Sequence, residues 1–318
     1  MDFSNYDIAI LMSTYNAEKY LSEQIESIIK QDTASWRLYI RDDGSTDKTC
    51  EIISRYAQNN ERIIFINENS RQNLGVTRSF LWLLKNVSAD FYMFCDQDDY
   101  WLSTKVRETL QEMLAQQYED IPVLVHSDLE VVDANLELIA SSFFERQGLP
   151  KNTVLTNLVV QNNVTGCTVM VNQKLKQSVA IVSDKVIIHD WWLALIATCL
   201  GKVVFVDKPL IKYRQHGNNV IGSSTVFSKF FSGYVQQIRD NLVALNEQNA
   251  EFKNIFESRL NDSQEKVLTV GSKFMKQSSI SRYFSVKHAG IYKIGKVRNL
   301  LFYCLLLILP KYRGGNDD

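Results

Sequence analysis

Three aspartates, Asp96, Asp98 and Asp99, lie within four residues of one another. They directly follow an apolar run, residues 91–95, of the kind that forms a buried strand. Carboxylates this close repel one another and lose hydration on burial, so a fold that keeps them together usually supplies a cation. Carboxylate oxygens in this spacing suit Mg²⁺ or Mn²⁺ bound together with a phosphorylated ligand. The alternative is an acidic loop that caps a helix starting near Thr104.

The composition is that of a folded protein without the overall charge of a nucleic-acid binder. A chain of 318 residues with 45% hydrophobic residues can form one large α/β domain and a smaller appendage. The formal net charge of −1 argues against a globally basic nucleic-acid binder. Five cysteines without a CxxC pair fit reduced thiols, so we expect a cytoplasmic protein. Asp2, Asn5 and Asp7 interrupt any apolar segment that could serve as a signal peptide.

Short apolar runs alternate with helical patterns along the first hundred residues. Residues 8–12 form the first run, and a helical pattern over residues 21–29 follows it. Further apolar runs occur at residues 37–40, 63–66 and 91–95, with a helical pattern between each run and the next. This alternation is typical of an α/β fold in which helices flank a mostly parallel, Rossmann-like sheet with right-handed crossovers.

Polar residues gather directly after these apolar runs. Ligands of parallel sheets bind beyond the carboxyl ends of the strands, so we expect one pocket to collect these side chains. They are Ser13, Tyr15, Asp42, Asp43, Asn73, Gly75, Asp96, Asp98 and Asp99. Neither a GxGxxG nor a GxxxxGK[ST] loop occurs in the sequence. The phosphates of a bound nucleotide would therefore be held by a cation rather than by a glycine-rich turn.

Three of these residues also have ordinary structural explanations. Asp42 and Asp43 precede Gly44 and fit a turn followed by a helix cap. Two successive acids would also suit hydrogen bonds to a base N–H or a ribose hydroxyl. Tyr15 is as consistent with ordinary packing as with stacking on a base.

An acid followed by two tryptophans, Asp190-Trp191-Trp192, opens an apolar helix that runs to Leu200. The N-terminus of a helix stabilises a carboxylate in its charged form, and indole rings can stack on a sugar ring. The alternative is an ordinary N-cap aspartate followed by two core tryptophans.

Three motifs in this order resemble the family 2 glycosyltransferases with the GT-A fold. They are Ser13-Thr14-Tyr15-Asn16, Arg41-Asp42-Asp43-Gly44-Ser45-Thr46-Asp47 and Asp96-Gln97-Asp98-Asp99-Tyr100-Trp101. The resemblance covers roughly the first two-thirds of the chain and is strongest to bacterial rhamnosyltransferase-type enzymes of cell-wall and capsular polysaccharide synthesis. It implies a nucleotide-sugar donor, with dTDP-L-rhamnose preferred and UDP-glucose or UDP-galactose as rivals.

The resemblance also implies roles on the donor side of the pocket. Ser13 and Tyr15 would line the nucleotide pocket, and Asp43, supported by Asp42, would read the pyrimidine base. Asp96 would lie near the sugar or ribose. Asp98 would be the main ligand of Mn²⁺ or Mg²⁺.

On the acceptor side, the resemblance implies an inverting transfer in which Asp190 is the general base. With the reference pKa of ~3.9 for an aspartate, this base would be ionised at neutral pH. Thr165 and Gly166 would face the acceptor and the donor sugar, with Trp191 and Trp192 stacking on a sugar. Inverting transfer needs no covalent intermediate, so we do not expect a nucleophilic role for Cys167.

A basic segment, Arg214-Gln215-His216, follows an apolar run at residues 209–211. The resemblance implies a loop that closes over the diphosphate, where Arg214 would contact phosphate and His216 would ligate the metal. A basic turn without a ligand is the alternative.

The chain after residue 222 has a different character. We expect a catalytic domain over residues 1–222 and a helical region over residues 223–318, with helices at 227–245 and 252–268. The apolar run at residues 300–310 has basic flanks and is shorter than the ~20 residues of a spanning helix. It suits the surface of an anionic membrane, or alternatively a core or homodimer interface. We therefore expect peripheral association with the inner face of the plasma membrane and a saccharide or lipid-linked acceptor.

Two other functions compete with this interpretation. A nucleotidyltransferase also uses carboxylates and Mg²⁺, but it would normally carry a glycine-rich loop with Lys or Arg near the N-terminus. A non-catalytic module that binds nucleotide sugars would be expected to have lost one of Asp43, Asp98 and Asp190, and the sequence retains all three.

Overall fold

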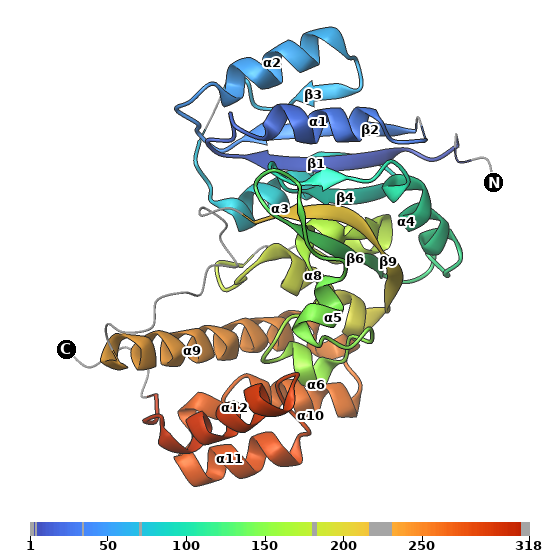
Figure 1. Cartoon of the computed structure of the whole chain (residues 1–318). Helices are drawn as coiled ribbons and strands as arrows, with labels where there is room; N and C mark the ends of the chain where they lie inside the picture. Colours follow the sequence, from blue (N-terminus) through green and yellow to red (C-terminus); the bar gives the residue numbers. More distant parts are fainter. Residues whose placement is uncertain are drawn as a thin grey trace.

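The computed structural model describes residues 3, 5–33, 35–69, 72–179, 183–215 and 231–312. In this part of the chain, one mixed sheet has helices on both faces, and a group of C-terminal helices packs beside it (Figure 1). The strands are β1 Ile8–Thr14, β2 Trp36–Asp42, β3 Ile63–Phe65, β4 Phe91–Cys95, β5 Tyr100–Trp101, β6 Val123–Val132, β7 Leu138–Ala140, β8 Met170–Asn172 and β9 Lys202–Arg214.

The helices follow the same order along the chain. The α-helices are α1 Leu21–Ile29, α2 Thr49–Asn59, α3 Val76–Asn86, α4 Lys105–Leu114, α5 Phe143–Gln147, α6 Leu155–Leu158, α7 Gln173–Ser178, α8 His189–Leu200, α9 Phe231–Phe256, α10 Asp262–Gly271, α11 Ser279–His288 and α12 Lys296–Ile308. Short 3-10 turns occur at η1 Gly166–Thr168, η2 Glu257–Arg259 and η3 Phe274–Lys276. None of the helices in the described ranges is long and apolar enough to cross a membrane.

The sheet has the strand order β3-β2-β1-β4-β8-β6-β9-β5, with β7 paired to β6. The first four strands in this order are mutually parallel, and β6 and β9 form a second parallel pair. Between them, β8 runs antiparallel to both β4 and β6. The parallel half brings the ends of β1, β2 and β4 together, because their connecting helices return the chain to the same edge.

Both faces of this sheet are buried, which explains the continuous apolar runs in the sequence. Successive side chains of a strand point to opposite faces. In β1, Ile8, Ile10 and Met12 contribute to the core under α1 and α4, whereas Ala9 and Leu11 contribute to the core under α3 and α8. The expected α/β fold with a mostly parallel, GT-A-like sheet is therefore confirmed.

Three strands were not evident from the sequence pattern. β5 has only two residues and pairs with β9, and β7 has three and pairs with β6. β9 has 13 residues, but the sequence pattern indicates only its apolar end at residues 209–211. Exposed Lys202, Asp207 and Lys208 interrupt its apolar character, and pairing with the buried strand β6 holds it in place.

The C-terminal helices differ from those expected. The sequence predicts helices over residues 227–245 and 252–268, but α9 continues to Phe256 and α10 begins at Asp262. Residues 227–230 lie outside the described part. Asn246 and Asn249, which lie between the two predicted helices, are buried and bonded to distant backbone. Asn246 Nδ2 donates to the carbonyl of Gly271, and Asn249 Nδ2 donates to the carbonyl of Val159.

The helical C-terminal region shares a hydrophobic core with the sheet. Phe252, Phe274 and Phe302 belong to the same buried cluster as Leu11 of β1. The residues between α11 and α12 are also bonded to the segment around α6. The amide of Tyr292 donates to the carbonyl of Thr156, and the amide of Ile294 donates to Gln161 Oε1. The boundary expected near residue 222 therefore separates two regions that share one core.

One buried cation, Arg282 of α11, ties these helices together. Its guanidinium donates to the carbonyls of Leu309 (3.1 Å), Gln277 (3.1 Å) and Phe274 (3.2 Å), with further bonds to neighbouring carbonyls. Burial lowers the pKa of this guanidinium, because the charged form loses its hydrating water. The Arg282 side chain thus donates the hydrogen bonds that water would otherwise give to the carbonyls at the ends of η3 and α12.

Replacing Arg282 by Met should therefore destabilise the fold. Arg282→Met fills a similar volume but leaves several buried carbonyls without donors, which we expect to cost roughly 3 kcal/mol of unfolding free energy. Urea unfolding followed by circular dichroism measures this change. Lys287→Met on the exposed side of the same helix is the matched control, with an expected change within about 0.5 kcal/mol. Equal stability of the two variants would contradict the assignment.

Candidate active site

The polar residues predicted to share one pocket meet at the carboxyl ends of β1, β2 and β4 (Figure 1). Two more elements reach the same place from later in the chain. The loop of residues 96–99 after β4 faces η1, and the N-terminus of α8 carries Asp190. The site is thus formed by segments that are widely separated in the sequence.

Asp42, at the end of β2, is fully buried and holds its own loop. Its carboxylate accepts hydrogen bonds from the amides of Gly44 (3.0 Å) and Ser45 (2.9 Å) and from Thr14 Oγ1 (3.1 Å). These bonds fasten the loop after β2 to the end of β1. This arrangement is consistent with Asp42 supporting the loop that carries Asp43. Asp42 itself has no exposed surface that could contact a ligand.

Asp43 is also buried, and it is held by the entrance of α3. Its carboxylate accepts from the amides of Leu74 (2.7 Å) and Gly75 (2.8 Å) and from the Arg41 guanidinium. Asn73 Nδ2 donates to the Asp43 carbonyl at 2.8 Å. Gly75 adopts φ +76, a conformation that favours glycine. Asn73 and Gly75 therefore position Asp43 in this structure.

Arg41 and Ser79 connect this carboxylate to β1. Arg41 also donates to Ser79 Oγ at 3.0 Å, and Ser13 Oγ donates to the same oxygen at 2.7 Å. Sequence reasoning placed Ser13 in the pocket but gave Arg41 and Ser79 no role. The signal for Arg41 was its place directly before the two aspartates, where a buried acid needs a counter-charge.

Tyr15 is half exposed, with 50% of its surface accessible, so ordinary core packing does not explain it. Its backbone is fixed by Gln97 of the acidic loop. Gln97 Oε1 accepts from the Tyr15 amide at 2.7 Å, and Gln97 Nε2 donates to the Tyr15 carbonyl at 3.2 Å. Gln97, which sequence reasoning left without a role, joins the loops after β1 and β4.

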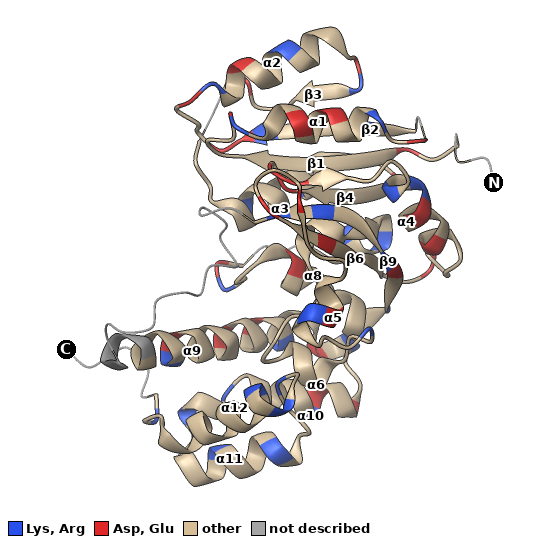
Figure 2. Ribbon diagram, in the orientation of Figure 1, with Lys and Arg blue, Asp and Glu red and all other residues tan. Residues whose placement is uncertain are grey.

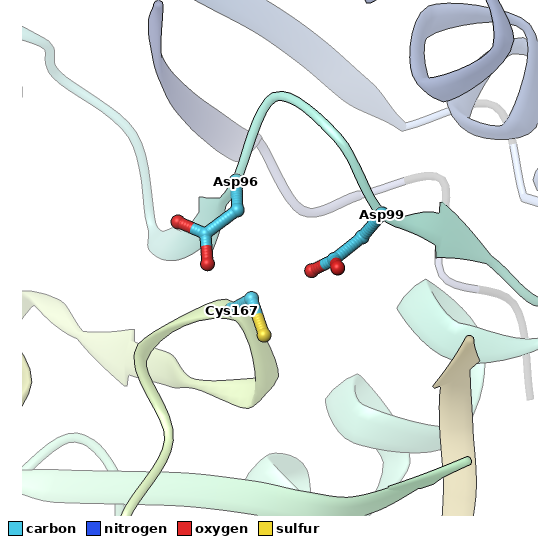
Figure 3. Close-up of side chains that lie close together, drawn as sticks. All are labelled: Asp96, Asp99 and Cys167. Carbon is cyan, nitrogen blue, oxygen red and sulfur yellow. The ribbon is translucent and has the colours of Figure 1, made fainter. Parts of the chain in front are cut away.

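Asp96 and Asp99 come together with Cys167 of η1 (Figure 3). One carboxylate oxygen of each aspartate and the thiol sulfur lie within 4.8 Å of one another. Asp98, the expected main ligand, is not part of this group of three, although its charge raises the pKa of both neighbouring aspartates. The structure thus places Asp99, for which the sequence indicated no ligand role, in the group of side chains that could hold a metal ion.

The acids of this loop are in an environment that opposes their negative charge. Burial, together with the charges of Asp98 and Asp190, raises the pKa of Asp96 to about 7. Burial and the charges of Asp96 and Asp98 raise the pKa of Asp99 well above its usual range. Lys105 is buried nearby, and burial lowers its pKa to about 8. Lys105 Nζ lies 4.3 Å from the centre of the Trp101 ring.

The residues of this loop fit a divalent cation. Asp99 Oδ2 is buried and has no hydrogen-bond partner among the described residues. Carboxylate oxygens are the preferred ligands of Mg²⁺ and Mn²⁺. Burial and the charges of Asp99 and Asp96 raise the pKa of the Cys167 thiol, which keeps it protonated. The carboxylates, rather than the sulfur, therefore make this a suitable site for a hard cation.

Asp190, in the first turn of α8, has 6% of its surface exposed. Its Oδ1 accepts from the amide of Trp191 at 2.6 Å and from Asn162 Nδ2 at 3.2 Å. Burial nevertheless raises the pKa of Asp190 to about 7, against the opposing effect of hydrogen bonds from backbone amides, among them that of Trp191. The expectation of an ordinary aspartate pKa is therefore wrong, because desolvation outweighs the helix N-terminus.

Gly166, which the resemblance implies would face the acceptor and the donor sugar, lies against this carboxylate. A Cβ at this position would lie 3.0 Å from His189 Nε2 and 3.2 Å from Asp190 Oδ2, so only glycine fits without displacing them. His189 is buried between Phe80 and Phe94, and burial lowers its pKa to about 3. Thr165 directly precedes this glycine and is partly exposed.

The two tryptophans after Asp190 have different surroundings. Trp192 is 1% exposed and packs edge-on against Phe252 at a ring distance of 5.4 Å, so it is a core residue and not a sugar platform. Trp191 is partly buried, and its indole N–H donates to the Leu158 carbonyl at 2.6 Å. The alternating exposure follows from the helix, which turns adjacent residues to different sides.

Arg214 fastens the acidic loop from behind. Its side chain is 2% exposed, and its guanidinium donates to the carbonyl of Asp98 (2.9 Å), to the carbonyl of Ala134 (2.6 Å) and to the Glu23 carboxylate. The expected contact with phosphate is not available to a guanidinium buried in this way. His216, the expected second metal ligand, lies outside the described residues.

Comparison with known proteins gives the family directly. The model of the family described as glycosyl transferase family 2 matches residues 9–177, more than half of the chain. A dTDP-rhamnosyl transferase RfbG of Shigella flexneri is 28% identical over 68% of this chain and 75% of its own length. The Escherichia coli glucosyltransferase WfgD, named for transfer from UDP-Glc to GlcNAc-diphosphoundecaprenol, is 28% identical over 48% of this chain and 56% of its own length.

Solved structures share the fold. S. aureus TarS in complex with UDP-GlcNAc matches with a TM-score of 0.54 at 18% identity, over 93% of this chain and 86% of that chain. The mannosyltransferase PcManGT of Pyrobaculum calidifontis, in complex with GDP-Man and Mn²⁺, also has a TM-score of 0.54, at 14% identity over 90% of this chain and 73% of that chain. With its sequence matched over more than half its length and its fold shared by these transferases, the chain belongs to glycosyl transferase family 2.

Proposed function

We propose that this glycosyltransferase is an inverting, metal-dependent enzyme that moves a sugar from a nucleotide sugar to a saccharide hydroxyl. The observation that carries the proposal is the pair of acidic groups with different surroundings. Asp190 is stabilised by a hydrogen bond from the α8 N-terminus, whereas one buried oxygen of Asp99 accepts no hydrogen bond from the part of the chain that the structure describes. The first suits a base, and the second suits a cation site.

The donor would bind along the ends of β1 and β2. The half-exposed Tyr15 is suited to stacking on a base. Asp43, whose amide donates to the carbonyl of the neighbouring Thr14 at 2.8 Å, is held rigidly as a hydrogen-bond acceptor. The preferred donor is dTDP-L-rhamnose, which the similarity to a dTDP-rhamnosyl transferase supports. UDP-glucose is the leading alternative because of the similarity to a UDP-Glc transferase, with UDP-galactose as a further rival.

Asp98, together with Asp96 and Asp99, would hold Mn²⁺ or Mg²⁺. Such a cation, when bound, supplies neutralisation of the negative charge on the nucleoside diphosphate. Arg214 would act on this loop indirectly, since its bond to the Asp98 carbonyl holds the backbone of the site. Gln97 would keep the loop aligned with Tyr15.

Asp190 would act as the general base. Its carboxylate accepts the proton of the acceptor hydroxyl, and the resulting oxygen attacks the anomeric carbon from the face opposite the leaving diphosphate. A pKa of about 7 suits this role, because proton transfer is most efficient when the pKa of the base lies near the working pH. Gly166 keeps the approach to this carboxylate open.

The acceptor would be a saccharide on a polysaccharide or lipid-linked precursor. WfgD, named for a diphosphoundecaprenol acceptor, supports this class. None of the five cysteines, all of which lie in the described ranges, forms a disulfide, which fits a cytoplasmic enzyme. The nucleotidyltransferase considered above has no support from the family assignment. A non-catalytic binding module remains the opposing hypothesis, and turnover separates it from an enzyme.

A panel of nucleotide sugars tests the donor and the cation together. We expect dTDP-L-rhamnose to bind most tightly, with Mn²⁺ or Mg²⁺ required and a chelator abolishing tight binding, as measured by calorimetry. Asp98→Ala should weaken metal-dependent binding at least ~10-fold. Asp120→Ala, an exposed acid on another part of the surface, is the control. Donor binding that is unchanged by chelator and by Asp98→Ala would make the cation assignment wrong.

Asp190→Asn should separate a base from a structural acid in the first turn of α8. The asparagine side-chain oxygen can accept the hydrogen bonds that Asp190 Oδ1 accepts from Trp191 and Asn162, so the thermal unfolding midpoint should stay near that of the wild type. Donor affinity should also be kept, while kcat falls ~10²–10⁴-fold because the amide cannot accept the proton. Asp207→Asn, an exposed acid, is the control for the charge change. Comparable turnover in the two variants would assign the base to another residue.

The pKa of Asp190 predicts the acidic side of the pH profile. Because a raised pKa leaves the base protonated at low pH, kcat/KM should rise up to about pH 7 and level off above it. Among the groups packed against Asp190, the neutral His189 does not titrate in this range, since its pKa is about 3. Asp96 also faces Asp190, and the cation should lower its pKa. A rate that is flat from pH 5.5 to 8.5 would count against Asp190 as base.

A further inference from the structure

Helix α12 has two apolar sides, of which only one faces the core. Phe302 and Leu306 are buried in the core shared with the sheet. The opposite side is exposed and equally apolar, with 71% of Val297, 64% of Leu300 and 75% of Ile308 accessible. The exposed stripe is formed by Val297, Leu300, Leu301, Cys304, Leu307 and Ile308. Their spacing of three and four residues places them along one side of the helix.

The neighbouring helix α11 adds apolar surface. Ile280 is 69% exposed and Phe284 is 52% exposed. The two helices are joined by aromatic packing, since the rings of Tyr283 and Tyr303 lie 5.7 Å apart, centre to centre. Phe284 packs against Tyr283 at 5.3 Å. The exposed sides of α11 and α12, called here the α11–α12 face, therefore belong to one rigid pair of helices.

The charge of this region differs from that of the remainder of the chain. Residues 266–316 contain no Asp or Glu, although the whole chain has 36 acidic and 35 basic residues. The basic residues of this segment are Lys266, Lys273, Lys276, Arg282, Lys287, Lys293, Lys296, Arg298, Lys311 and Arg313. Figure 2 shows Lys and Arg, and no Asp or Glu, along α11 and α12. Lys296 and Lys311 are exposed at either end of the α12 stripe.

An exposed apolar stripe with basic residues at both ends matches the surface of an anionic lipid bilayer. Apolar side chains enter the boundary between headgroups and acyl chains, and lysines contact the lipid phosphates. With 13 residues, α12 is shorter than the ~20 needed to span a bilayer, so it would lie along the surface. A second copy of this face would bring like charges together, which disfavours self-association here.

We propose that the α11–α12 face docks on an anionic phospholipid bilayer. The inference rests on surface chemistry alone and does not depend on the donor, the cation or the base proposed above. The exposed stripe is not needed to hold α12 in the fold, because Phe302 and Leu306 pack into the core from the other side of the helix. Substitutions on the exposed stripe should therefore change lipid binding without unfolding the protein.

Sedimentation of the full chain with vesicles tests this proposal. We expect binding to phosphatidylcholine vesicles that contain phosphatidylglycerol, little binding to pure phosphatidylcholine, and weakening by salt. A stripe variant, Leu300→Gln/Leu307→Gln/Ile308→Gln, should lose at least ~10-fold in vesicle binding. A charge variant, Lys296→Gln/Lys311→Gln, should lose about fivefold for each lysine.

Matched controls use exposed residues elsewhere on the surface. Leu138→Gln/Ile139→Gln/Val154→Gln controls for the apolar substitutions, and Lys85→Gln/Lys174→Gln controls for the charge substitutions. Both control variants should bind vesicles like the wild type. Thermal unfolding verifies that every variant is folded, and if the stripe variant is not, the charge variant and the salt dependence decide the outcome.

Three results would overturn the proposal. The first is wild-type protein that does not prefer the anionic vesicles. The second is binding by both the stripe and the charge variants that equals that of the wild type. The third is a wild-type dimer in analytical ultracentrifugation that becomes monomeric in the stripe variant while no vesicles are bound, which would identify the face as an interface between copies.

Discussion

Buried carboxylates are the constraint on which the rest of this structure depends. Asp42, Asp43, Asp99 and Asp190 are all nearly inaccessible to water, although an aspartate loses much of its hydration energy on burial. The fold compensates for the first two with backbone amides from the loops after β2 and before α3. The Asp190 carboxylate accepts a hydrogen bond from the amide of Trp191 at the start of α8. Among these four acids, Asp99 receives the fewest hydrogen bonds from the described residues for the hydration that it loses. This difference distinguishes the acids that hold the fold together from an acid suited to a cation.

The scaffold around these acids includes one amide side chain, Gln97, and two buried arginines, Arg41 and Arg214. Gln97 joins the loops after β1 and β4, and Arg214 holds the acidic loop through the Asp98 carbonyl. Arg41 supplies the counter-charge for Asp43 at the other side of the site. An arginine buried in this way exchanges water for several fixed acceptors, so its removal would loosen a loop rather than remove one contact. The rigid positioning of the acids therefore comes from residues of distant strands.

The C-terminal helices are connected to the same site. The amide of Ile294, between α11 and α12, donates to Gln161, and the next residue, Asn162, donates to Asp190. The shared hydrophobic core, with Phe252 against Trp192 of α8, strengthens this connection. A face of α11 and α12 that rests on a membrane would thus be rigidly linked to the loop beside Asp190. This connection would keep the site at a fixed position relative to such a membrane.

The sequence by itself determined the α/β class, the parallel strands and the gathering of acids at their ends. Continuous apolar runs form strands buried on both faces, and the residues after them must meet at one edge of the sheet. Only the tertiary structure decided how completely each acid is hydrogen-bonded, because burial and hydrogen-bond partners come from segments far apart in sequence. Cys167 of η1 lies close to Asp99. Arg214, expected to contact phosphate, instead binds the Asp98 carbonyl, and Trp192, expected to stack on a sugar, is buried in the core. The raised pKa of Asp190 is likewise a property of the folded pocket, since local sequence specifies the helix N-terminus but not the loss of water around it.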